Sequence, residues 1–360
     1  MKPEELEYII KLNRKKKEEQ LENKSKKRLG KVSKRRGVAP VIPQNKPAPH
    51  PIYPKTFPKF EPVTNSNIRL EEGRIIMVDR DIQTQPIKED RVMVTGHLGH
   101  LGKPTTELLG DTYDIVGYDI KEHNDLLNLS NLVYKMNGCA FVVHGAGIPH
   151  PNPRYDFPDY FTQNVIGTLN VCKAAELLKV KRVIYMSSGG LLGWDTEGKF
   201  TPDYFPIDEA HVPASVSGHY TGKLNGYGTS KFLCEQVLAW YATNGKFQVV
   251  CLRLAPALTN GLDAMKEGKY LPDRNKTFWT NTLPATCAKA VKKALTAEIS
   301  NPFEIINVVE KEIVVTGVDI GEYLKEQWEG VELRDWEAPM SLMDTKKAEK
   351  LLNLYDESEG

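Results

Sequence analysis

A tyrosine and a lysine stand four residues apart in the stretch NGYGTSKFLCE, residues 225–235. If this stretch is helical, Tyr227 and Lys231 lie on one face, one turn apart. The phenol of tyrosine ordinarily has a pKa of about 10, but a neighbouring ammonium favours the phenolate and lowers that pKa. The pair could then take the proton of a substrate hydroxyl. The same spacing is common by chance on amphipathic helices, so the pair alone also fits a surface role.

A serine at the end of an apolar run supplies a third group. The run KRVIYMSS, residues 181–188, ends in two serines, and we select Ser188 as the residue that holds the substrate oxygen. Ligands of open α/β sheets bind at the carboxyl ends of the strands, where this serine would lie. We therefore expect Ser188, Tyr227 and Lys231 to form one site that removes a hydroxyl proton while hydride leaves the same carbon.

A glycine-rich turn indicates a dinucleotide. The run 91–95 leads directly into TGHLGHLG, with glycines at positions 96, 99 and 102. Between a strand and a helix, Gly96, Gly99 and Gly102 permit a tight turn and close approach to a pyrophosphate, which the first N–H groups of the helix bind. Asp119, 17 residues after Gly102, ends the next run, where it can accept hydrogen bonds from the adenosine ribose. In the alternative, the glycines only end a strand and Asp119 is a solvated turn residue.

The expected cofactor is NAD. Asp119 would repel the 2′-phosphate of NADP, a preference that Lys121 weakens. Further residues expected to line the cofactor are His97, Leu98 and Leu101 in the turn, Ile120, Asp125 and Leu126 after the second run, and His144, Gly145 and Ala146 at the end of the third. A helix cap is an equally weighted role for Asp125. Pro104 is expected to disturb the helix after the turn, beyond its pyrophosphate end.

The elements that must position these residues are short apolar runs separated by segments of helix length. The runs are 91–95, 114–119, 139–144, 181–188, 247–254 and 303–309. Such near-continuous Val/Ile runs are typical of a parallel sheet covered on both faces. The segments 160–180 and 229–244 show the three- and four-residue apolar spacing of covering helices. The sequence therefore predicts an α/β fold with a doubly wound, Rossmann-like parallel sheet.

Charge and proline content separate an N-terminal arm from the rest. Residues 1–37 carry a net charge of +8, whereas the remainder carries −7. Eight prolines lie between residues 40 and 62, a composition typical of an extended spacer. We expect residues 1–62 to form a disordered arm or linker that is first basic and then Pro-rich. Residues 63–89 form a connecting segment of uncertain structure with a short strand at 75–78. Residues 90–255 form the NAD-binding domain with the Ser/Tyr/Lys set, and residues 256–360 form a small, mainly substrate-binding portion from which one strand, about 303–309, returns to the sheet.

Composition also bounds the compartment and partners. No stretch reaches the roughly 18 to 20 apolar residues of a membrane helix, and the N-terminus lacks an apolar secretory core. The five cysteines show no CxxC spacing and lie in apolar stretches, so we expect reduced core thiols and no metal site. We expect a cytoplasmic protein without a membrane span. The basic arm is either a solvated tail or a contact for an anionic partner that the sequence does not specify.

Over about residues 90–355 the chain resembles the extended short-chain dehydrogenase/reductase family, the NAD-dependent epimerase/dehydratases of sugars and nucleotide sugars. The stretches that carry the resemblance are TGHLGHLG, VVHGAG, NVIGTLNVCKAAELLKVKRVIYMSSGGLLG, YGTSK, LRLAPAL and LMDTKKAEKLLNL. The resemblance implies that Tyr227 is the base and that Lys231 also holds the nicotinamide ribose. It implies the family's Ser/Thr role for Ser188, five residues before Gly193, and an architectural role for Asn164. It also implies a homodimer through a four-helix interface.

The chain departs from the family in ways that bear on its substrate. The segment between Ser188 and Tyr227 is long, with WDTEGKFTPDYF like an inserted loop, and TLPATCAKAV replaces a substrate-side element. The short portion after Pro256 weighs against a large nucleotide-sugar pocket. The leading hypothesis is an NAD-dependent epimerase or dehydratase of a nucleotide sugar. The alternatives are an NAD-dependent sugar or uronate dehydrogenase that releases NADH and, from another class, a non-catalytic dinucleotide-binding regulatory or structural protein that acts through its basic arm.

Overall fold

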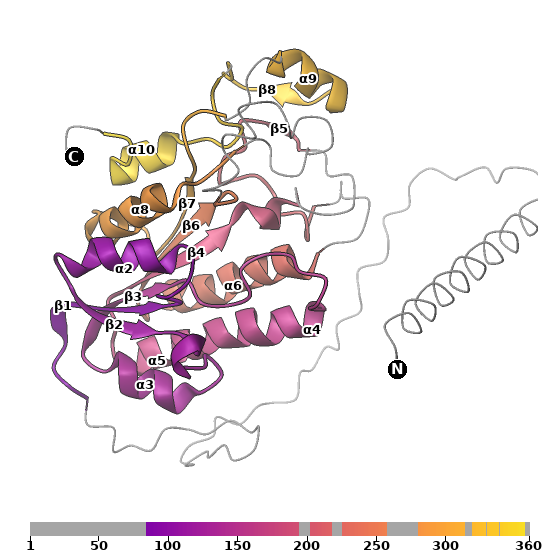
Figure 1. The fold of residues 1–360 in the computed structure, drawn as a ribbon. Helices are drawn as coiled ribbons and strands as arrows, with labels where there is room; N and C mark the ends of the chain where they lie inside the picture. The colour runs from indigo at the N-terminus through magenta and orange to yellow at the C-terminus, as the bar shows by residue number, and fades with distance from the viewer. Residues whose placement is uncertain are drawn as a thin grey trace, which may run out of the picture. The chain divides into compact units, whose positions relative to one another are not determined.

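A six-stranded parallel sheet in the order β2-β1-β3-β4-β6-β7 forms the centre of the protein (Figure 1). The computed structural model describes residues 84–193, 202–217, 225–257, 280–313, 319–328, 330–337 and 339–356. The strands are β1 (Lys88–Thr95), β2 (Asp114–Tyr118), β3 (Cys139–His144), β4 (Arg182–Ser188), β6 (Gln248–Leu254) and β7 (Phe303–Val308). Each of these strands overlaps one of the six apolar runs, so the predicted Rossmann-like α/β sheet is confirmed.

The strand order fixes where a ligand site can form. The chain passes from β1 to β2 on one side and then returns to place β3 on the other side of β1. In open α/β sheets, ligands bind at such a reversal, beyond the carboxyl ends of the flanking strands, which here are β1 and β3. Because all six strands are parallel, the ends of β4 and β6 lie at the same edge. The glycine turn after β1 and Ser188 at the end of β4 therefore share one edge of the sheet.

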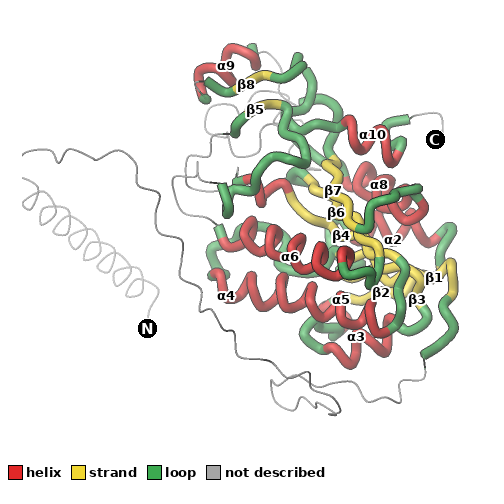
Figure 2. The backbone as a smooth tube through the Cα atoms, turned by 180° about the vertical axis from the view of Figure 1, so that it is seen from behind, coloured by secondary structure: helices red, strands yellow, loops and turns green. Residues whose placement is uncertain are grey.

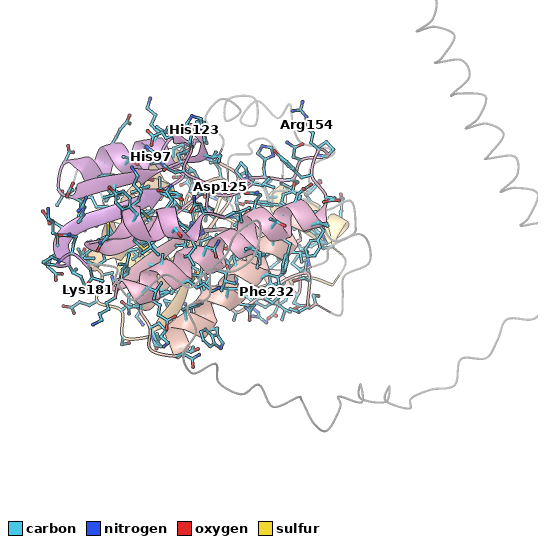
Figure 3. The ribbon with its side chains drawn as sticks, turned by 90° about the horizontal axis from the view of Figure 1, so that it is seen from below. His97, His123, Asp125, Arg154, Lys181 and Phe232 are labelled. Atoms are coloured by element: carbon cyan, nitrogen blue, oxygen red, sulfur yellow. The ribbon has the colours of Figure 1, made fainter. Side chains whose placement is uncertain are left out.

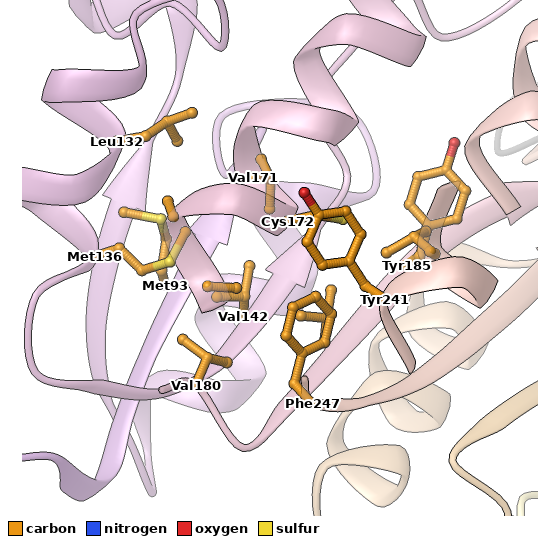
Figure 4. Close-up of a cluster of buried hydrophobic side chains, with 14 of the residues drawn as sticks. Met93, Leu132, Met136, Val142, Val171, Cys172, Val180, Tyr185, Tyr241 and Phe247 are labelled. Carbon is orange, nitrogen blue, oxygen red and sulfur yellow. The ribbon is translucent and has the colours of Figure 1, made fainter. Parts of the chain in front are cut away.

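Helices cover both faces of the sheet, as the front and rear views show (Figures 1 and 2). One face carries α2 (Gly102–Gly110), α8 (Pro284–Thr296) and α10 (Lys346–Leu352), and the other α3 (Leu129–Met136), α4 (Phe157–Tyr160), the π-helix η2 (Phe161–Ile166), α5 (Gly167–Leu177) and α6 (Gly226–Thr243). Neighbouring strand residues serve opposite cores: Val92 and Val94 pack with α2 and α8, and Met93 with α3 and α5. Figure 4 shows the core on the face covered by α3, α5 and α6, around Met93 and Val142. Burial on both faces is why the strand runs are apolar throughout.

A smaller layer joins the segment before α6 to the C-terminal part of the chain. Its parallel strands are β5 (Tyr204–Phe205) and β8 (Glu332–Leu333), next to α9 (Ile320–Gln327). The ring of Phe205 lies 5.4 Å from that of Trp328, and both belong to a buried apolar cluster with Leu324. Of the expected inserted loop, 194–201 lies outside the described residues, whereas its last two residues form β5.

Several other expectations can be compared with the structure. The arm 1–62 and the strand at 75–78 lie outside the described residues, and β1 begins at Lys88, inside the segment 63–89. Pro104 is the third residue of α2, where a helix needs no backbone donor, so the expected disturbance of hydrogen bonding does not arise. The five cysteines are buried free thiols, as predicted. Within the described parts of the chain, no helix is long and apolar enough to cross a membrane.

A buried ion pair locks α6 to the sheet. Arg253 in β6 donates from Nη2 to Glu235 Oε2 at 2.9 Å and from Nε to Glu235 Oε1 at 3.0 Å, and both side chains are at least 97% buried. Ser187 in β4 donates to the same Oε1 at 2.7 Å. A buried charge whose partner is removed is strongly destabilising. This network therefore fixes the helix that carries Tyr227 and Lys231.

We predict that Glu235→Gln lowers the free energy of unfolding by about 3–5 kcal/mol, because it leaves the buried Arg253 cation without its ion-pair partner. Denaturant unfolding measures the change. The matched control is Glu89→Gln, which removes an exposed pair with Lys181 and should cost less than about 1 kcal/mol. Equal losses in the two variants would show that the buried pair does not hold α6.

Candidate active site

The glycine turn after β1 has no room for side chains. Gly96 has φ +74°, and a Cβ there would lie 2.9 Å from Ala146 N. A Cβ on Gly102 would lie 1.9 Å from Gly96 O, and Gly99 N donates to that same carbonyl at 2.9 Å. The turn leads into α2, whose first turn has no side-chain cap. An uncapped helix start behind a bare glycine turn fits the pyrophosphate of a dinucleotide.

Asp119 lies just beyond β2 and is buried. Its Oδ2 accepts from Leu98 N at 3.2 Å and its Oδ1 from Lys121 N at 2.9 Å. A carboxylate can accept about four hydrogen bonds, so it retains acceptor capacity for ribose hydroxyls. The Lys121 ammonium donates to Leu98 O at 3.0 Å. The acid that was predicted to bind the ribose is therefore held against the glycine turn.

The other predicted contacts of the adenosine half differ in where their side chains lie. Asp125 Oδ1 accepts from Leu127 N at 3.0 Å, and α3 is capped by Asn128, so Asp125 does not cap that helix.

Leu126 is buried in the core against Gly167. Leu101 also packs on a core, whereas Leu98 is partly exposed and Ile120 is more exposed still. His97 approaches Glu122 at 3.6 Å. Figure 3 shows His97 and Asp125 away from Lys181, which precedes β4.

His144 ends β3 inside the protein. Its Nδ1 is 2.8 Å from Thr95 Oγ1 and its Nε2 is 3.0 Å from Thr168 Oγ1. Burial and the nearby Lys231 charge lower the pKa of His144 to about 3, so its ring is neutral. Thr95 Oγ1 also accepts from Ala146 N at 3.2 Å, and Gly145 N donates to Thr95 O at 3.1 Å. The histidine thus ties β1, β3 and α5 together, and of the predicted set it is Gly145 and Ala146 that border the glycine turn.

Tyr227 and Lys231 lie in the first two turns of α6, as expected from their spacing. Both are buried. The Lys231 ammonium donates to Met186 O at 2.9 Å and lies 4.8 Å from the ring centre of Tyr185 and 5.9 Å from that of Tyr227. Burial lowers the pKa of Lys231. The Lys231 ammonium is therefore held beside the ring of Tyr227 by the backbone of β4.

Ser188 is brought to the start of α6. It ends β4 and its Oγ accepts from Gly190 N at 3.0 Å, in the turn η3 (Gly189–Leu192). A Cβ on Gly228 would lie 2.5 Å from Gly190 O, so the backbone next to Tyr227 touches the turn that follows Ser188. The structure thus gathers the three predicted residues at the carboxyl end of β4.

Three further residues support Tyr227. Asn164 in η2 accepts from Ile148 N at 2.7 Å and donates to Ser230 Oγ at 2.8 Å, and Ser230 donates to Tyr227 O at 2.7 Å. The ring of Tyr160 packs edge-on at 6.2 Å from that of Tyr227. Asn164 therefore has the architectural surroundings that the resemblance implied. Sequence reasoning missed Ser230 and Tyr160; the position of Ser230, three residues after Tyr227, was a usable signal, but nothing marked Tyr160.

Several characterised proteins are similar to this chain. L-arabinose 1-dehydrogenase (NAD(P)(+)) of Haloferax volcanii is 24% identical over 61% of this chain and 87% of its own length. UDP-glucose 4-epimerase of Bacillus subtilis is 28% identical over 56% of this chain, but the match spans only 61% of the epimerase. The match to UDP-glucose 4-epimerase of Bos taurus spans only 48% of that enzyme.

Solved structures share the fold. UDP-glucose 4-epimerase from Brucella ovis in complex with NAD has a TM-score of 0.52 at 21% identity and covers 73% of this chain and 92% of the epimerase. MoeE5 in complex with UDP-glucuronic acid and NAD has a TM-score of 0.52 at 20% identity, with the same coverage. Residues 92–274, half of the chain, match a family described as NAD dependent epimerase/dehydratase. The glycine turn, the buried acid and the Ser/Tyr/Lys group lie on one sheet edge. Because half of the chain matches this family, the chain belongs to the NAD dependent epimerase/dehydratase family of enzymes.

Proposed function

We propose that this chain is an NAD-dependent epimerase or dehydratase of a nucleotide sugar that works by transient hydride transfer, with Tyr227 as the base. The observation that carries the proposal is the Lys231 ammonium, held by Met186 O beside Tyr227 at the sheet edge that also bears the glycine turn. The UDP-glucose 4-epimerases among its relatives support the substrate class. Family membership, the bare glycine turn and the buried Asp119 support NAD as the cofactor.

Each side chain has a task that its position permits. The glycine turn and the start of α2 bind the pyrophosphate, and Asp119 accepts from the ribose hydroxyls. NAD, when bound, supplies the hydride acceptor. Ser188 holds the substrate oxygen, and Tyr227 takes the hydroxyl proton from it. Lys231 stabilises the phenolate that Tyr227 uses, because its charge stays close and is poorly screened in a buried site.

We expect Tyr227→Phe to lower kcat by about 10²–10⁴-fold, the usual contribution of a positioned proton acceptor, while NAD binding is retained. Turnover of a panel of nucleotide sugars and uronic acids, with dinucleotide binding measured in parallel, checks this. The control is Tyr134→Phe, whose ring is 76% exposed on α3. Unchanged turnover in Tyr227→Phe would contradict Tyr227 as the base, whereas a wild type that binds dinucleotide without turning over any sugar of the panel would favour a non-catalytic dinucleotide-binding protein.

A pH profile tests Lys231. Its protonated form supports the phenolate, and burial lowers its pKa below that of an exposed lysine. Activity is therefore expected to be present below this lowered pKa and to fall as the pH rises through it. Lys231→Met should have low activity without this alkaline decline, whereas Lys246→Met, which removes a surface pair with Glu176, should keep the wild-type profile. An unchanged alkaline decline in Lys231→Met contradicts the assignment.

A sugar or uronate dehydrogenase is the second candidate. The relative with the fuller coverage of its own length is named as an L-arabinose 1-dehydrogenase. The two candidates differ in whether the hydride leaves with the cofactor. Stoichiometric accumulation of NADH during turnover would favour the dehydrogenase, whereas turnover without net NADH favours the epimerase or dehydratase.

We also propose a homodimer through the outer faces of α5 and α6. The supporting observation is that Leu177 and Trp240, one on each helix, are 48% and 57% exposed. Burial of these apolar side chains against a second copy would stabilise a dimer. Light scattering should give twice the chain mass for the wild type and the monomer mass for Trp240→Glu; a monomeric wild type contradicts the proposal.

A further inference from the structure

Two groups of opposite charge, the Asp119 carboxylate and the Lys121 ammonium, contact one peptide at the expected ribose site. The peptide of Leu98 contacts both of them: its N–H donates to Asp119 Oδ2 at 3.2 Å, and its carbonyl accepts from Lys121 Nζ at 3.0 Å. The backbone N–H of Lys121 donates to the other carboxylate oxygen at 2.9 Å. The ammonium therefore contacts the glycine turn through the same peptide that donates to the carboxylate.

The Lys121 charge is not neutralised by another acid. Among the described residues no carboxylate lies within ion-pair distance of its ammonium, and the adjacent Glu122 instead approaches His97 Nε2 at 3.6 Å. Asp119 is buried and already accepts two backbone hydrogen bonds, which hold its position. The structure thus offers an ammonium whose present acceptor is a single neutral carbonyl.

These charges act in opposite directions on a phosphate. An acid at the end of the second strand binds the ribose 2′-hydroxyl and repels a 2′-phosphate, which is why such an acid selects NAD. An ammonium at similar range attracts the same phosphate through charge-assisted hydrogen bonds. Both groups contact the Leu98 peptide, so a phosphate bound beside that peptide would meet the repulsion and the attraction together. The acid alone does not set the preference here.

We propose that Lys121 is a specificity-determining residue that lets this chain accept NADP as well as NAD. The proposal rests on the proposed dinucleotide site and adds the 2′-phosphate to what that site binds. On binding, the Lys121 ammonium exchanges the Leu98 carbonyl for the 2′-phosphate, a stronger acceptor. Asp119 keeps its backbone donors throughout, so the turn retains its shape.

Binding of NAD⁺ and NADP⁺ by calorimetry tests the proposal without turnover. We expect the wild type to bind NADP⁺ within about tenfold of NAD⁺, and Lys121→Gln to weaken NADP⁺ by about 10–100-fold with NAD⁺ changed by less than about threefold, as for loss of one charge-assisted hydrogen bond. Lys121→Arg should keep both affinities. The control is Lys103→Gln, 71% exposed in the first turn of α2, whose charge acts on both dinucleotides alike.

The outcomes separate this inference from the proposed function. A wild-type preference for NAD⁺ beyond about tenfold, or equal loss of both dinucleotides in Lys121→Gln, overturns the role of Lys121 and leaves the NAD site intact. Failure of the wild type to bind either dinucleotide overturns the NAD site and this inference together. Retained NAD⁺ binding in Lys121→Gln shows that the turn remains folded in that variant.

Discussion

A buried ammonium governs the arrangement of this protein's sheet edge. Taking an ammonium out of water costs several kcal/mol unless nearby groups compensate it. For Lys231 the compensation comes from Met186 O at 2.9 Å and from the faces of two aromatic rings. That carbonyl belongs to β4, so the lysine is stable only while α6 lies close along the strand. Glu235 lies one turn further along the same helix face and pairs with Arg253. Tyr227, Lys231 and Glu235 thus follow at four-residue intervals along α6, and the ion pair of Glu235 with Arg253 holds this helix at the sheet.

The hydrogen bonds around His144 join elements of the sheet without adding a charge near Lys231. The histidine ring is completely buried, and both nitrogens have hydroxyl partners, from the end of β1 and from α5. A second cation in this region would oppose Lys231, and the low pKa of the histidine avoids that conflict. Thr95 then serves both sides, because its hydroxyl contacts the histidine and also accepts from Ala146 N beside Gly96. The surroundings of His144 and the glycine turn are in this way joined through one threonine.

Much of this arrangement could be predicted from local sequence. The strand runs are apolar because both faces of the sheet are covered, and the turn residues are glycines because Gly102 touches Gly96 O. Contacts between distant segments left no such trace. The partners of His144 lie 49 and 24 residues away, and those of Glu235 lie 18 and 48 away. The cofactor contact of Leu126 stays a prediction, and nothing in the sequence indicated that its side chain fills the space beside Gly167 in the core.

The π-helix between α4 and α5 has an evolutionary consequence. A π-turn accommodates one residue more than an α-helical turn, and here it directs Asn164 toward Ile148 and Ser230. Loss of a single residue from this segment would restore regular winding and swing the amide by about 100° around the helix axis. Two backbone groups and a hydroxyl would lose their partner at once. Point substitutions can accumulate on the outer side of this helix, but changes in its length should be rejected by selection.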